Sequence, residues 1–125
     1  MDKKYVLTGL GYAIIGLLLG IYMAASHNHG HLVTHAHIML LGFVVSFIYG
    51  VCHKVWLVNP SPKLVNAQFY LHQVGTLVLL LGLFSMYSGA TGAWLEPVLA
   101  ISSLCVLVAM ILMKILFIKA SKQLS

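Results

Sequence analysis

Four long apolar runs alternate with short polar connections along the chain. The runs cover Tyr5–Ala25, Val33–Val58, Phe69–Ser88 and Pro97–Ile118. Each is close to the ~20 residues that an α-helix needs to cross the hydrocarbon core of a bilayer. The runs are continuous rather than alternating, which argues against the short strands of a membrane barrel. The pattern therefore predicts one all-α domain over residues 1–125, an integral membrane four-helix bundle.

The connections carry residues that are typical of helix ends. Gly30, Pro60 and Gly92 lie between the runs, and Pro97 opens the fourth one. Proline suits the first turn of a helix because its missing N–H would have no partner there. The first run also resembles a signal peptide, but it is longer than the usual ~7–15 apolar residues of one. We therefore expect it to be a retained span.

The composition agrees with a membrane protein. Hydrophobic residues make up 61% of the chain and charged residues only 7%, whereas soluble domains carry about 25% charged residues. Soluble enzymes and nucleic-acid-binding modules are excluded on this ground, and the lipid bilayer is the first expected partner.

Charge placement predicts the orientation. The seven basic residues are all lysines, and four spans place every one of them on the same side. The positive-inside rule makes this side the cytoplasm, so both termini are expected to be cytoplasmic. Tryptophan and tyrosine are enriched at both membrane–water interfaces, so we also expect aromatic belts there. Their candidate members are Tyr5, Trp56 and Tyr70 on the inner side and Tyr22, Tyr87 and Trp94 on the outer side.

Histidines are the main candidates for chemistry, because polar ligand residues within a membrane are costly and indicate function. His35 and His37 open the second span. Residues two apart on an α-helix point about 200° away from each other, so these two imidazoles are expected to serve two different sites or neighbours. The alternative is that they only cap the helix or form hydrogen bonds at the interface.

Three further histidines form the segment HNHGH in the outer connection. His27, His29 and His31 are of the type that binds copper, zinc or nickel from a flexible loop. The alternative is a solvated polar loop without a metal.

Two histidines belong to the opposite side of the membrane. His53 lies about 27 Å along a helix from His35, and His72 begins the third span on that same side. Together they are candidates for an inner haem or metal site, or else they only form hydrogen bonds near the lipid headgroups. Asp and Glu occur only near the span ends, at Asp2 and Glu96, so a carboxylate proton relay is not expected.

The segment HAHIMLLGFVVSFIYGVCHKVWL resembles the tenth helix of subunit I of heme-copper oxidases, and QFYLHQVGTLVLLLGLFSMYSG resembles the helix that follows it. The matching positions are His35, His37, Gly50, His53 and His72. The chain is also similar to small four-span bacterial membrane proteins that carry a HAHxxLxG segment. The resemblance covers roughly residues 33–90.

This resemblance implies a cofactor, an assembly and a location. In the oxidase helix the first histidine of the pair ligates one haem and the second ligates another, so His35 and His37 would each hold a different haem b. Subunit I consists of three arcs of four helices, and a four-span chain looks like one arc. The resemblance therefore implies a homotrimer in the bacterial cytoplasmic (inner) membrane, in which each iron takes His35 from one chain and His37 from the next.

The expected function follows from this ligation. Two histidines leave iron without an open position, which suits electron transfer or haem handling, with a redox partner or quinol, rather than substrate turnover. The copper-site histidines of the oxidases have no counterparts here, so oxygen reduction is not expected and no catalytic residue is assigned. The alternative function is copper or zinc binding or transport by the outer histidines.

Overall fold

The computed structural model describes residues 1–124, and within them every regular element is a helix. The elements are α1 (Asp2–Ser26), α2 (Leu32–His37), the π-helix η1 (Ile38–Val45), α3 (Ser46–Val55), α4 (Pro62–Tyr87) and α5 (Leu95–Leu124). Three of them, α2, η1 and α3, run on as one rod. The described residues thus form four helices that are long and apolar enough to cross a membrane, as the pattern predicted.

The largest difference from the predicted boundaries is at the start of α4. This helix begins at Pro62 rather than near Phe69, and Pro62 occupies a first-turn position that does not need its N–H. The sequence predicted a connection up to Asn66, yet α4 begins within it, and Gln68 in the second turn of α4 is fully buried. The second span ends at Val55, three residues before its predicted end. Pro97 lies in the first turn of α5, where we expected it.

A π-helical stretch interrupts the second span directly after His37. Its sequence, IMLLGFVV, is uniformly apolar and gives no signal of this geometry. In a π-helix the backbone hydrogen bonds join residues i and i+5. Helices of this type are rare, and they occur frequently at functional sites. The stretch changes the angular register between the histidine-bearing α2 and the α3 segment that packs on the start of α1.

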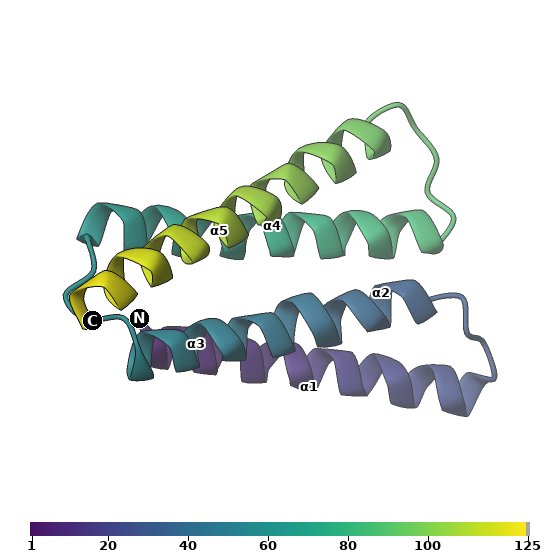
Figure 1. Cartoon of the computed structure of the whole chain (residues 1–125). Helices are drawn as coiled ribbons and strands as arrows, with labels where there is room; N and C mark the ends of the chain where they lie inside the picture. Colours follow the sequence, from purple (N-terminus) through teal and green to yellow (C-terminus); the bar gives the residue numbers. More distant parts are fainter. Residues whose placement is uncertain (125) are drawn as a thin grey trace.

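Two helical hairpins make up the bundle. The rod of α2, η1 and α3 packs along α1, while α5 packs along α4, and both termini lie at the same end of the molecule (Figure 1). A core of tyrosine, phenylalanine and aliphatic side chains joins the hairpins at this end. It consists of Tyr5, Tyr49, Leu57, Val65, Phe69, Met113, Leu116 and Ala120.

Large apolar side chains also cover the outside of every span. Leu7 and Ile21 on α1 are 70% and 65% exposed, and similar residues occur on the other helices. A surface of this kind fits a lipid or protein environment rather than water. One predicted interfacial residue is in fact internal, because Tyr5 has no exposed surface at all. The other five aromatic candidates are exposed.

Candidate functional site

The histidines divide between the two ends of the bundle. His27, His29, His31, His35 and His37 lie around the connection between α1 and α2, at the end opposite the termini. The other two lie nearer the end that holds the termini, on α3 and α4. The grouping of five and two therefore agrees with the sequence prediction.

His35 is held against α1 by a hydrogen bond. Its Nδ1 lies 2.8 Å from the carbonyl oxygen of Gly16, and because a carbonyl only accepts, Nδ1 carries the proton. The ring also packs over Gly20, where an added Cβ would lie 3.1 Å from Cε1. Gly16 and Gly20, which are spaced four apart on α1, thus both serve contacts within the chain. Gly16 supplies the acceptor and Gly20 the space for the imidazole.

His37 has the same protonation pattern with a different partner. Its Nδ1 lies 2.9 Å from the carbonyl oxygen of Val33, one turn earlier on the same helix, so Nδ1–H donates here as well. Within residues 1–124 no protein group is hydrogen-bonded to Nε2 of either His35 or His37. In the neutral form of each ring this tautomer leaves Nε2 as the acceptor nitrogen, which is the form that binds a metal.

The two rings are directed to different sides of the rod. His35 faces α1, and α-helical geometry places His37 about 200° around the axis from it. Their side chains therefore cannot converge on one metal within a single chain. Any site that uses both imidazoles as axial ligands needs a second chain.

His31 joins the loop between α1 and α2 to the end of α4 through side-chain contacts. Its Nε2 lies 3.1 Å from the hydroxyl of Ser88 and its Nδ1 lies 3.4 Å from the hydroxyl of Thr34. The ring also stacks on Phe84, with centroids 4.5 Å apart and planes 10° apart. These contacts give His31 a structural role in joining the hairpins.

The other two histidines of this connection are exposed. His27 ends α1 in the left-handed conformation, with φ of 55°, and His29 accepts a backbone hydrogen bond from Leu32. Among the residues that the structure describes, no three His, Cys, Asp or Glu side chains are placed to hold a metal ion together. A metal site at His27, His29 and His31 stays a prediction.

A second polar cluster lies deep in the half of the bundle that holds the termini. His72 on α4 has no exposed surface, and its Nε2 lies 2.9 Å from the hydroxyl of Ser46 on α3. The ring of Tyr49 packs edge-on against it at 5.0 Å. This histidine thus joins the two hairpins through a buried hydrogen bond and an aromatic contact.

Tyr5 connects this histidine to the rest of the cluster. Its hydroxyl donates to Oε1 of Gln68, and the amide of Gln68 donates to the carbonyl oxygen of Ala109 on α5 at 3.3 Å. The Tyr5 ring lies 5.9 Å from that of His72 and stacks at 5.8 Å on that of His53. The structure therefore brings His53 and His72 into one cluster, with Tyr5 in contact with both.

Three buried polar atoms of the cluster have no hydrogen-bond partner among the described residues. They are Nε2 of His53, Nδ1 of His72 and the hydroxyl of Thr76.

The sequence carried a signal for part of this cluster that our prediction did not use. Gln68, His72 and Thr76 are spaced four apart in an apolar run, so they share one face of α4.

The hydrogen bond between Ser46 and His72 leads to a prediction on stability. We expect Ser46→Ala to lower the free energy of unfolding in detergent by about 1 kcal/mol, because it leaves a second buried nitrogen of His72 without a partner. The matched control is Ser103→Ala, since the exposed hydroxyl of Ser103 bonds only to the Leu99 carbonyl one turn away. Equal losses in the two variants would contradict the role given to Ser46.

No family model matches the chain, and comparison with curated proteins and with solved structures gives no match either.

Proposed function

We propose that this chain binds haem b through His35 and His37 and serves electron transfer or haem handling in a membrane. The observation that carries the proposal is the state of the two imidazoles. Both donate Nδ1–H to a backbone carbonyl, at 2.8 and 2.9 Å, and in the neutral ring this tautomer leaves Nε2 able to bind a metal. A hydrogen bond of this kind fixes the orientation of a metal-bound histidine and raises its basicity.

The residues present fit a haem with two histidine ligands. Imidazole is a common axial ligand of haem iron, and a bound haem would supply a one-electron redox centre. Two protein ligands fill both axial positions, so the protein holds the group without leaving a place for a substrate. The proposal therefore assigns no catalytic residue and requires a redox partner, such as a quinol, to supply or accept the electron.

The opposite directions of the two rings support sharing between copies. We propose a homotrimer in which His35 of one chain and His37 of the next form each haem site. Closed cyclic symmetry permits such head-to-tail contacts, because every chain then offers the same two surfaces. The half-buried position of His35 and the exposed apolar side chains of each span are compatible with further burial by a neighbour.

The proposed location is the bacterial cytoplasmic membrane, with the termini inside. In the structure both termini lie at one end of the bundle, and lysines occupy the turns of α1, α3, α4 and α5 nearest to it. The positive-inside rule assigns such an end to the cytoplasm. The haem sites would then lie near the outer surface.

The absorption spectrum of the purified full chain tests this function. We expect a Soret band with the sharp α band of low-spin haem, and one haem per chain. Elemental analysis of the same sample separates this proposal from copper or zinc binding. A folded protein that contains no haem after incubation with haemin, or that holds copper or zinc in a 1:1 ratio instead, would contradict the proposal.

A further inference from the structure

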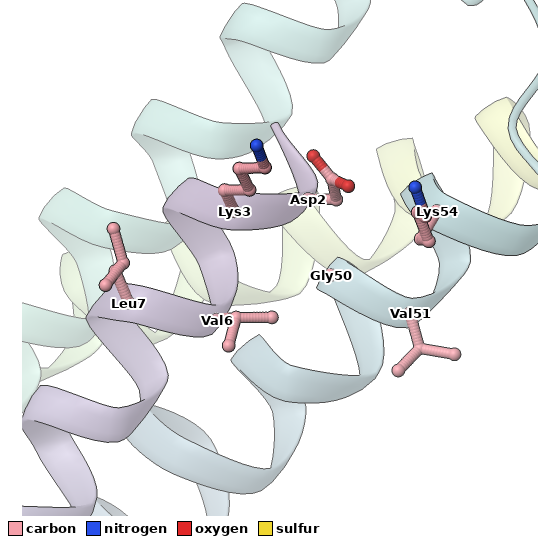
Figure 2. Close-up of a pocket in the computed structure, with 7 residues that line it drawn as sticks. All are labelled: Asp2, Lys3, Val6, Leu7, Gly50, Val51 and Lys54. Atoms are coloured by element: carbon pink, nitrogen blue, oxygen red, sulfur yellow. The ribbon is translucent and has the colours of Figure 1, made fainter.

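A groove lies between the start of α1 and the end of α3, at the end of the bundle that holds the termini (Figure 2). Its volume is about 430 Å³, within the range of ~300–1,000 Å³ that is typical of small-molecule sites. Seven residues line it: Asp2, Lys3, Val6, Leu7, Gly50, Val51 and Lys54. None of these belongs to the proposed haem site.

Gly50 lets the two helices meet closely at the floor of the groove. A Cβ at this position would lie 3.1 Å from the carbonyl oxygen of Asp2 and 3.1 Å from Cγ2 of Val6. The backbones of α1 and α3 therefore approach closely at Gly50. The side chains of Val6, Leu7 and Val51 stand beside this contact and leave an aliphatic channel (Figure 2).

The charged groups gather at one end of the channel. Figure 2 shows the side chains of Lys3 and Lys54 on the same side of the groove as Asp2, away from the aliphatic residues. The carboxylate of Asp2 lies 3.9 Å from the amino terminus of the chain. Three positive groups thus accompany one carboxylate at this rim, which gives the rim a net charge of +2.

We propose that this groove binds an anionic phospholipid. One acyl chain would lie along Val6, Leu7 and Val51, and the phosphate would lie against the ammonium groups of Lys3 and Lys54, outside the Asp2 carboxylate that stands between them in Figure 2. The arrangement matches an amphiphile with an aliphatic tail and a negative headgroup, because apolar walls and positive groups occupy adjacent parts of one groove.

The charges favour a lipid over a second copy of this chain. The protein has only two acidic side chains. One of them, Asp2, already lies in this rim, and the other, Glu96, is at the start of α5, at the opposite end of the bundle. An acidic side chain of a neighbouring copy is therefore not available to pair with Lys3 and Lys54, whereas an anionic lipid headgroup carries the required charge.

Native mass spectrometry of the full chain in detergent tests the site. The chain is titrated with phosphatidylglycerol and, separately, with phosphatidylcholine of the same acyl composition. We expect tighter binding of phosphatidylglycerol, and we expect Lys3→Gln and Lys54→Gln each to weaken it about fivefold, and the double variant about 30-fold. The matched control is Lys63→Gln with Lys119→Gln, which changes the net charge equally outside the groove.

A second variant tests the apolar half of the same groove. Val51→Trp fills the channel and keeps both lysines, so we expect it to weaken binding of both lipids at least tenfold, with the same unfolding temperature as the wild type. Equal weakening by the control pair would show unspecific charge attraction and overturn the proposal. Displacement of the lipid by an equal concentration of inorganic phosphate would also overturn it, because the channel would then contribute nothing.

Discussion

We expect replacement of either His35 or His37 by alanine to lower the affinity for haem at least ~100-fold, and each substitution alone should have this effect. Changes to hydrogen-bond partners of metal ligands typically cost 10–100-fold, so loss of the ligand itself is expected to cost more. The remaining histidine would leave one axial position of the iron open, and the spectrum of any residual complex should change from low spin to high spin. Titration with haemin, followed at the Soret band, measures both effects.

The control for this experiment is His27→Ala. His27 is exposed at the same end of the bundle and forms no hydrogen bond with the rings of His35 or His37. Its replacement should leave affinity and spectrum unchanged. If His27→Ala releases the haem while His37→Ala keeps it, the ligands have been assigned wrongly and the outer connection is the binding element.

Substitution of Gly20, which lies against the ring of His35, is the second change for which we expect a large effect on haem binding. We expect Gly20→Val to weaken haem binding about 10–100-fold without removing any ligand. A Cβ at Gly20 would lie 3.1, 3.5 and 3.8 Å from Cε1, Nδ1 and Nε2 of His35. The two additional methyl groups of valine therefore displace the imidazole, and Nδ1 loses its alignment with the Gly16 carbonyl.

Gly11→Val is the matched control in the same helix. A Cβ at Gly11 meets no atom within 4 Å, yet the change in helix propensity is the same. Haem affinity is measured for both variants, together with the unfolding temperature. Equal affinities at matched stability would show that the position of the His35 ring does not matter for binding.

The four spans were predictable because a bilayer imposes a length and an apolar composition on each helix. The boundaries were less accurate where polar residues turned inward. The predicted connection ended at Asn66, so Gln68 stood at the edge of the predicted span, but it lies inside α4, where Tyr5 and the Ala109 carbonyl satisfy its amide group. A hydropathy pattern records only that a residue is polar. The hydrogen-bond partners that offset the cost of burying Gln68 lie on other helices.

In the candidate site, too, the features set by helix geometry could be predicted, whereas contacts with other helices could not. The spacing of His35 and His37 already indicated two directions, because it depends only on helix geometry. The acceptors of their Nδ1 protons were not predictable, since Gly16 belongs to another helix. The π-helix after His37 was not predictable either, because its residues are uniformly apolar. The prediction that Tyr5 belongs to an aromatic belt was wrong. Its contacts with Gln68 and His72 involve residues that are distant in the sequence, so they could not be predicted from it.

The central claim is that each haem is shared by two chains, and mixing the two histidine variants tests it most directly. Chains with His35→Ala and chains with His37→Ala are produced together with different affinity tags, and assemblies that contain both are isolated. In a ring of three with both variants, only one junction joins an intact His35 to an intact His37. We predict that neither variant alone shows a low-spin spectrum and that the mixed assembly recovers about one third of the wild-type haem. Mixed assemblies with no recovered low-spin haem would contradict the shared site.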